Sequence, residues 1–308
     1  MEKKASRRNF LAAGLSLPAA GIGASRFARP PVGLMQAAAA PEMDTAYKGP
    51  KMTVELHLGV PTLFVDGKPN VGRAYYGGHV REKAVKAFGD AGVDFVSFIY
   101  SGSKGPRGSA RHAWESREVY DFSDFDESVH AILKANPTAK IFPRVVLFAP
   151  QWWLDENPGE CMVYHDGTTV KPLRGGGASA MPAWSSQKWR EDTALYLRKL
   201  IGHVAAKPYA ASIAGYHLAS GGTEEWYYWP NWRWFFFQEN QDIVDYSKPQ
   251  AEAFRRYLRA KYGTEAGLRA AWHYETVTFE TAQIAPTILE MLSLDPNKLT
   301  DLGDEIPF

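Results

Sequence analysis

Short, almost wholly apolar segments alternate with longer amphipathic ones from residue 71 onward, and this alternation restricts the possible folds more than any other feature of the chain. Continuous apolar runs are typical of strands in a parallel sheet that is buried on both faces. The helices that connect such strands show the longer, amphipathic pattern. We expect strands over residues 73–77, 94–100, 139–149 and 213–219.

The amphipathic stretches predict a helix after each strand. A side-chain oxygen placed just before a helix can accept a backbone N–H of the first turn. Ser123 is therefore a candidate cap for the second helix, and Ser185 or Ser186 for the third. The helices are expected over residues 80–91, 123–135, 185–204 and 249–262.

Four β/α repeats in this order predict an α/β fold of the (β/α)8 TIM-barrel type. No glycine-rich phosphate motif follows the first strand, which argues against a dinucleotide-binding fold. A complete barrel takes about 250 residues, so we expect only the first half or so, in a chain that is part of a longer protein. Residues 41–52 are expected to form a flexible lead, and 53–69, with turn residues at Asp66–Gly67, a β-hairpin.

The first 40 residues have the composition of an export signal. The pair Arg7–Arg8 precedes a weakly apolar stretch and a run of alanines that ends at Ala40, as in twin-arginine signals. The alternative is a membrane anchor or a surface helix, but the apolar part is short and rich in glycine and alanine. We expect cleavage near Ala40 and a periplasmic or extracellular protein without a membrane anchor after signal removal.

Charge and cysteine content exclude several classes of function. Without residues 1–40 the chain has 29 basic and 33 acidic residues, a net charge of −4, which does not favour binding to nucleic acid or to an anionic membrane. Cys161 is the single cysteine, and the eight histidines show no metal-ligand spacing, so neither a cysteine-rich metal site nor a zinc site is expected. No Gly-x-Ser-x-Gly motif supports a serine hydrolase.

The region after the fourth strand is the best candidate for chemistry, because barrel active sites lie at the carboxyl ends of the strands. Glu224 and Glu225 are adjacent there and precede Trp226. An aromatic wall desolvates a carboxyl group and raises its pKa, which suits a general acid. The alternative is a solvated acidic pair in a surface loop.

Aromatic residues follow two of the strands. Residues 226–237 contain nine aromatics in twelve positions, and Trp152 and Trp153 follow the third strand. Sugar rings stack on aromatic faces, so these side chains are candidates for substrate binding. The alternative for each ring is packing into the rim of the fold. For most of the rings in residues 226–237, packing is the expected role.

Three further residues complete the predicted substrate-binding set. Arg144 lies within an apolar strand and needs a partner, which could be a catalytic carboxylate, a substrate hydroxyl or a structural ion pair. Tyr100 and His217 lie in the second and fourth strands. Asp121, Asp124 and Asp126 are interpreted as helix-start residues rather than catalysts.

Several motifs resemble the catalytic barrel of family 42 β-galactosidases and related clan A glycoside hydrolases, over about residues 60–308. The helix at 254–263, followed by Ala271–Trp272, is the most specific. The others are Phe-Val-Asp-Gly-Lys-Pro (64–69), Ala-Gly-Val-Asp-Phe-Val (91–96), Tyr-Asp-Phe-Ser-Asp-Phe-Asp (120–126) and Ala-Pro-Gln-Trp-Trp-Leu (149–154).

The resemblance implies a retaining mechanism with two carboxylates about 5 Å apart. It implies Glu225, which directly precedes Trp226, as the acid/base, with Glu224 as the close alternative. The chain departs from the family pattern here, because the clan usually has asparagine where Glu224 stands. The nucleophile would follow a seventh strand, which this chain does not include.

The implied activity is the cleavage of β-linked sugars, β-galactosides among them, from oligo- or polysaccharides, without a cofactor. Related barrels often form homo-oligomers. A non-catalytic exported carbohydrate-binding protein is the alternative, and a purely structural or partner-binding exported domain is a third interpretation. The domains expected are the signal (1–40), the lead and hairpin (41–70) and a partial catalytic barrel (71–308).

Overall fold

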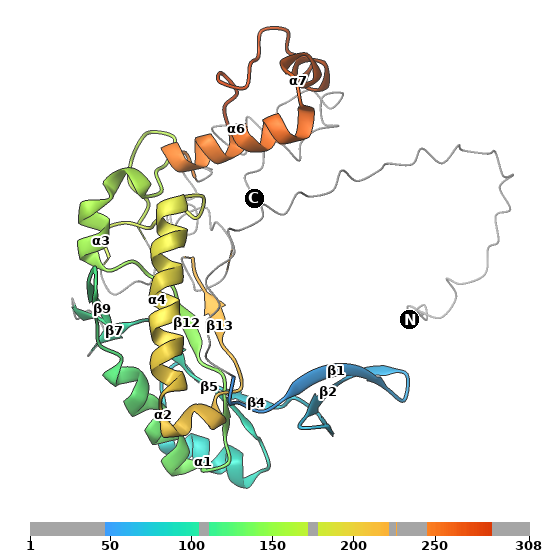
Figure 1. The fold of residues 1–308 in the computed structure, drawn as a ribbon, viewed down its shortest axis with the longest axis vertical. Coiled ribbons are helices and arrows are strands. Elements are labelled where there is room, and N and C mark those ends of the chain that lie inside the picture. The colour runs from blue at the N-terminus through green and yellow to red at the C-terminus, as the bar shows by residue number, and fades with distance from the viewer. Residues whose placement is uncertain (1–46, 105–110, 172–177, 222–225, 227–244, 285–308) are drawn as a thin grey trace, which may run out of the picture. The chain divides into compact units, whose positions relative to one another are not determined.

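A computed structural model of the chain describes residues 47–104, 111–171, 178–221, 226 and 245–284. The chain divides into two units, residues 1–42 and 43–308, and everything described belongs to the second. This unit is a mixed α/β structure (Figure 1). None of its described helices combines the length and the apolar character that a bilayer span requires.

Parallel strands that follow one another in chain order form the centre of this unit. The second and third predicted strands are each divided into two short pieces, and Pro143, which has no N–H to donate, lies at the second interruption. The strands are β4 (Ala74–Tyr76), β5 (Phe95–Ser97), β6 (Ile99–Tyr100), β11 (Lys140–Ile141), β12 (Arg144–Val146) and β13 (His217–Ala219). Each predicted strand pairs in parallel with the next predicted strand along the chain. The pieces are hydrogen-bonded in two groups, in the orders β11-β5-β4 and β13-β12-β6.

The helices between these strands pack on one face of the sheet (Figure 1). A single buried cluster joins Val85 of α1, Phe125 of α2 and Leu200 of α4 to Val96 and Val145 of the sheet. Right-handed crossovers between strands in sequential order place every connecting helix on the same side. The helices are α1 (Glu82–Asp90), α2 (Ser123–Ala135) and α4 (Gln187–Ala205).

The predicted helix ends lie within two residues of the observed ones. Ser186 caps α4, where its Oγ accepts the Trp189 N–H at 3.0 Å. Helix α6 (Lys248–Tyr262) begins one residue before the prediction. The predicted cap of α2 is wrong, because Ser123 is its first residue, and Phe122 occupies the cap position without a capping side chain. The Ser123 N–H instead donates to Asp121 Oδ1 at 3.0 Å.

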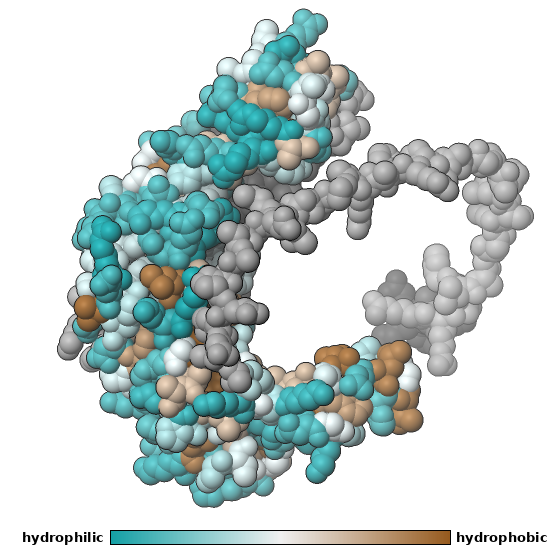
Figure 2. Space-filling model, viewed as in Figure 1, coloured by the Kyte–Doolittle hydropathy of each residue, from teal (hydrophilic) through white to brown (hydrophobic). Residues whose placement is uncertain are grey.

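The predicted hairpin is an antiparallel meander of three strands, β1 (Met52–His57), β2 (Val60–Val65) and β3 (Lys68–Asn70). The turn between β1 and β2 is Leu58–Gly59, with both residues at positive φ, and Asp66–Gly67 instead turns β2 into β3. Figure 2 shows apolar side chains gathered on this meander, where Leu58 is 92% exposed.

Two described residues of the predicted lead make hydrogen bonds to distant parts of the unit. The Tyr47 hydroxyl donates to Ala214 O at 3.0 Å, and Lys48 Nζ donates to Ala205 O at 2.9 Å. A Cβ at Gly49 would clash with Ile213 O, so glycine permits this close approach.

Several described elements had no counterpart in the prediction, and most lie in loops beyond the strands. Helix α7 packs with α6 around Phe254, Leu258 and Leu268 in a second buried cluster. These elements are the short hairpins β7 (Ser103–Lys104) with β8 (Arg111–His112) and β9 (Trp114–Ser116) with β10 (Val119–Tyr120), and the helices α3 (Gln151–Glu156), η1 (Pro158–Glu160), η2 (Pro208–Ser212) and α7 (Glu265–Trp272).

Candidate functional site

The two carboxylates predicted for catalysis, Glu224 and Glu225, lie outside the described residues. The same is true of the aromatic stretch after Trp226. The described part of the candidate site therefore consists of the sheet face opposite the helices and of the residues around the carboxyl end of β13.

A row of side chains crosses the sheet face that the helices leave open. Arg144 is in register with Ile99 on one neighbouring strand and with His217 on the other. Side chains in register on parallel strands point to the same face, and the adjacent Val145 belongs to the helix-covered core. The Arg144 guanidinium lies over the ring of Tyr76, 4.9 Å from its centroid.

This row combines a cation with accessible polar groups. Tyr76 is 51% exposed and His217 is exposed. The Arg144 side chain is half-buried, and its distance from the Tyr76 ring allows a cation–π interaction. The predicted candidates Arg144 and His217 thus lie side by side, and Tyr76 joins them although the substrate-binding prediction did not include it.

A second group of side chains lies at the carboxyl end of β13. Trp226 is 53% exposed, and its Nε1 donates to Leu218 O at 2.8 Å. The Trp184 ring lies 5.6 Å from it, centroid to centroid, at an interplanar angle of 55°. Trp184 Nε1 donates to the Oγ of the buried Ser220 at 3.2 Å. Trp184 was missed in the sequence because a single tryptophan in a long loop has no periodicity to mark it.

Trp152 and Trp153 have different environments although they are adjacent. Trp152 is half-buried, donates from Nε1 to Trp114 O at 3.0 Å, and meets the Trp114 ring edge-on at 5.2 Å. Trp153 is 1% exposed and packs edge-on against Trp189 of α4 at 4.9 Å.

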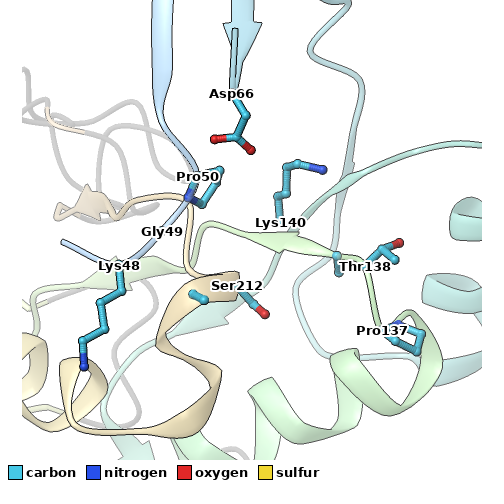
Figure 3. A pocket seen from close by; sticks show the side chains of 10 residues that line it. Lys48, Gly49, Pro50, Asp66, Pro137, Thr138, Lys140 and Ser212 are labelled. Carbon is cyan, nitrogen blue, oxygen red and sulfur yellow. The ribbon is translucent and has the colours of Figure 1, made fainter. Parts of the chain in front are cut away.

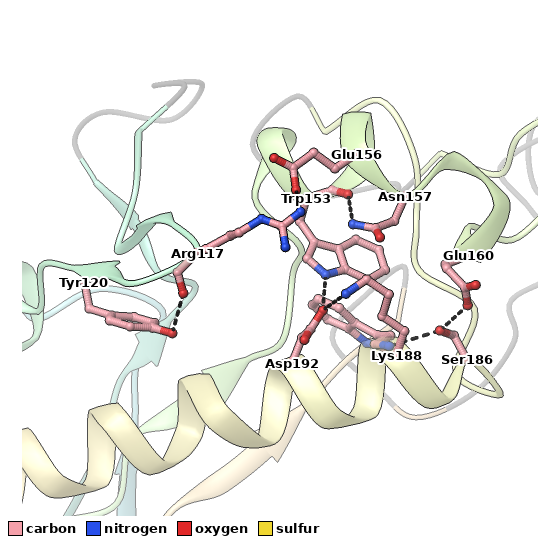
Figure 4. Close-up of polar contacts among 10 residues, drawn as sticks. Arg117, Tyr120, Trp153, Glu156, Asn157, Glu160, Ser186, Lys188 and Asp192 are labelled. Carbon is pink, nitrogen blue, oxygen red and sulfur yellow. Dashed lines mark hydrogen bonds and ion pairs between the residues drawn. The ribbon is translucent and has the colours of Figure 1, made fainter.

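Polar contacts fix Trp153 in the core. Its Nε1 donates to Asp192 Oδ2 at 2.8 Å, and Lys188 Nζ pairs with the same oxygen at 2.9 Å. Figure 4 shows Trp153 pointing from α3 toward these two residues on α4, and Arg117 reaching Glu156 beside it. The ring offers no free face to a sugar, so the structure supports the packing alternative for Trp153.

Tyr100 is also a core residue in this structure, in contrast to its predicted role in substrate binding. It is 5% exposed and meets Phe125 of α2 edge-on at 5.1 Å. Burial raises the pKa of its hydroxyl well above the ordinary value, with a further contribution from Tyr196. Because its ring faces the helices, it lies on the opposite side of the sheet from Arg144.

Asp126 connects helices, as expected for a structural residue rather than a catalyst. It lies in α2 and binds His203 and Lys207, each at 2.8 Å, and the Tyr209 hydroxyl. Burial acts to raise the pKa of this carboxyl, but the hydrogen bonds from Lys207, Tyr209 and His203 outweigh it, so the pKa is lowered.

Two other titratable groups are buried near the strand ends and in the loops. Burial lowers the pKa of His112 to about 4, although a hydrogen bond to the Phe148 backbone acts in the opposite direction. Its Nδ1 accepts the Trp114 N–H at 3.0 Å, so the ring is neutral and structural. Burial raises the pKa of Asp245 to about 6 against hydrogen bonds from Ser247 and the Val163 N–H.

A polar pocket of about 350 Å³ lies at the amino-terminal side of the sheet, away from the predicted site (Figure 3). Lys140 and Asp66 line it, and the Lys48 side chain points away from both (Figure 3). Within the described ranges no cluster of three or more histidine, cysteine or acidic side chains is arranged to hold a metal ion.

No protein-family model and no curated protein sequence matches this chain. Several solved structures resemble it. A β-galactosidase from the Antarctic haloarchaeon Halorubrum lacusprofundi is 22% identical with a TM-score of 0.47, and one from Marinomonas ef1 is 16% identical with a TM-score of 0.45. The catalytic domain of a β-amylase from Paenibacillus polymyxa is 13% identical with a TM-score of 0.46.

Each likeness covers 70% of this chain, but only 29% and 30% of the two β-galactosidases and 53% of the β-amylase domain. The chain therefore spans about three tenths of the length of those β-galactosidases. These identities and TM-scores do not assign the chain to a family.

Proposed function

We propose that this chain belongs to a glycoside hydrolase that cleaves β-linked sugars, and that its parallel sheet is part of a (β/α)8 barrel. One observation carries the proposal. Parallel strands in sequential order have their helices on one face, and the other face presents Arg144, Tyr76 and His217. In a barrel that open face is the interior, and its carboxyl end is where substrates bind.

The proposed chemistry uses two carboxylates in a retaining mechanism. Glu225 protonates the glycosidic oxygen and later activates water, and Glu224 is the alternative for this role. The second carboxylate, the nucleophile, is not assigned to any residue of this chain.

The described side chains have distinct parts in the proposed site. Arg144 and His217 bind substrate hydroxyls or orient a carboxylate, because their N–H groups are donors on the open face. Trp226 stacks on a sugar ring, and the half-buried Trp152 contributes an edge of the site. Trp153 supports this arrangement from the core.

We place the activity outside the cytoplasm, where the twin-arginine leader would deliver a folded enzyme to oligo- or polysaccharides. β-Galactosides are the specific substrates proposed, and homo-oligomers are compatible with this function.

The proposal is tested with Glu225→Gln in the full-length protein, assayed on β-galactosides with good and poor leaving groups. Loss of a general acid slows turnover by about 10²- to 10⁴-fold, and only where the leaving group needs a proton. Glu224→Gln is the matched control and is expected to keep most of the activity. Equal activity of Glu225→Gln and wild type on poor leaving groups would refute the assignment.

The same assay separates the two functions considered from the sequence. Sugar binding by a wild-type protein that hydrolyses none of the β-galactosides would identify a carbohydrate-binding protein instead. Absence of both sugar binding and hydrolysis would exclude both.

A further inference from the structure

We propose that one apolar face of the β1–β2–β3 meander closes the amino-terminal end of the barrel interior, and that the strands completing the barrel cover the exposed part of this face. The inference rests on the barrel of the proposed function. The apolar face consists of Met52, Val54 and Leu56 of β1 with Pro61, Leu63 and Val65 of β2.

The antiparallel register places these six side chains on one side of the meander, because partners in register point to the same side of a sheet. The register partners are Met52 with Val65, Val54 with Leu63, and Leu56 with Pro61. Every polar side chain of β1 and β2 lies on the other face, namely Thr53, Glu55, His57 and Thr62. An antiparallel sheet with this division normally packs its apolar face against other parts of the protein.

One end of the apolar face is already covered by the parallel strands. Val65 is 6% exposed, and it packs with Leu63 in a cluster that also contains Phe95, Phe142 and Ala214. Phe95 is the first residue of β5, and the other two shortly precede β12 and β13. The cover therefore consists of apolar residues at the amino-terminal ends of three strands.

These contacts identify the side of the sheet that the meander closes. Val96, next to Phe95, belongs to the helix-covered cluster, so Phe95 faces the open side, because neighbouring side chains in a strand alternate. The meander packs at the amino-terminal end of the same face that presents Arg144 and His217. In a barrel this position is the bottom of the interior.

The other end of the apolar face is exposed. Along β1 the exposed fraction rises from 38% at Met52 through 70% at Val54 to 78% at Leu56, and Figure 2 shows this apolar surface. The distance from Met52 to Leu56 is about 14 Å at about 3.4 Å per residue, and neighbouring strands of a sheet are about 4.8 Å apart. The exposed end is therefore long enough to lie beneath about three further strands.

Continuity with the covered end determines the occupant. The exposed end continues the face that Phe95 and Ala214 already cover, and no charged or polar side chain of β1 or β2 interrupts it. The occupant that fits is therefore a set of apolar, inward-facing residues at the amino-terminal ends of further barrel strands, rather than a second copy of the chain. Such contacts extend the packed interior of a barrel to its lower end.

The test compares Leu56→Asp with His57→Asp by thermal unfolding of the full-length protein. Replacing a side chain as exposed as Leu56 should be nearly neutral unless other strands cover it. We expect Leu56→Asp to lower the Tm by at least about 5 °C, because the carboxylate would be placed among apolar side chains. His57→Asp introduces the same residue at the adjacent position on the polar face, and it should change the Tm by no more than about 2 °C.

Leu56→Ala replaces the aspartate variant if that variant does not fold, and we expect it to lower the Tm by at least about 4 °C. An unchanged Tm in both Leu56 variants would show that the face is uncovered and would overturn the inference. Light scattering measures the molar mass of each variant, and a smaller mass for Leu56→Asp than for wild type would identify a second copy as the occupant, which also overturns it.

Hydrolysis of β-galactosides by the wild type tests the proposed function separately. An active wild type whose Tm does not depend on residue 56 would refute this inference and leave the proposed function standing. An inactive wild type that loses stability on Leu56→Asp, at unchanged molar mass, would refute the enzymatic activity and support the covered face.

Discussion

Replacing Asp126 by asparagine should destabilise the fold more than any other single change of charge in α2. The Asp126 carboxylate binds Lys207 and His203 at 2.8 Å each and accepts a hydrogen bond from the Tyr209 hydroxyl. It thereby connects α2 to the end of α4 and to η2, which follow it by about 80 residues. Asparagine keeps the shape of the side chain but loses its charge and one acceptor oxygen.

The magnitude follows from these contacts and from burial. The Asp126 side chain is 18% exposed, so its ion pairs are only partly screened. Hydrogen bonds to charged groups contribute about 1.5–3 kcal/mol each, and breaking a buried pair costs about 3–5 kcal/mol. Because asparagine still accepts one bond, we expect a loss of about 2–4 kcal/mol, which lowers the Tm of a domain of this size by about 4–16 °C.

The assay is thermal unfolding followed by circular dichroism, at pH 7 and at decreasing pH. The pKa of Asp126 is below its ordinary value of 3.8 in the folded protein. Its stabilising effect is therefore complete above that value and is lost as the pH falls through the lowered pKa. The difference between wild type and Asp126→Asn should shrink in acid.

Glu127→Gln is the matched control, since it removes an exposed carboxylate from the same helix. We expect its Tm to differ from that of the wild type by no more than about 2 °C. An equal loss of Tm in both variants, or a difference for Asp126→Asn that does not depend on pH, would show that the contacts to Lys207, His203 and Tyr209 do not stabilise the fold.

Three further predictions concern other parts of the described structure. Trp153→Phe should lower the free energy of unfolding by about 1–3 kcal/mol, because it leaves a gap in the core and removes the hydrogen bond to Asp192. Chemical denaturation measures this free energy. An unchanged value would indicate that the ring lies outside the core. The pKa of Asp245 is raised to about 6, so its charged form destabilises the folded protein. The wild type should therefore gain stability from this group as the pH falls from about 7 to about 4. Denaturation at the two pH values measures this gain, which Asp245→Asn should not show. Arg144→Lys retains the charge but loses the guanidinium over Tyr76. It should weaken sugar binding about tenfold in calorimetry and lower the Tm by no more than about 4 °C. A large loss of Tm would instead favour a structural ion pair.

Local features of the sequence were sufficient to predict the order of the parallel strands and of helices α1, α2, α4 and α6. Apolar runs and helical periodicity depend on neighbouring residues, and so do caps such as Ser186, whose side chain bonds a backbone group three residues away. The errors at this level are also local. The prediction placed the turn of the hairpin at Asp66–Gly67, because these residues are typical of turns. The first turn of the meander is instead Leu58–Gly59, where leucine has a positive φ that is rare for this residue.

Only the tertiary structure decided what each aromatic or charged side chain contacts. Trp152 and Trp153 are adjacent in sequence, yet one is half-buried and the other lies in the core, because a short helix turns them toward different neighbours. Trp184 meets Trp226 through the folding of two loops that share no periodicity. Periodicity identifies which face of an element is apolar, but the partner of that face depends on how distant segments pack, and that information is not contained in any local window of the chain.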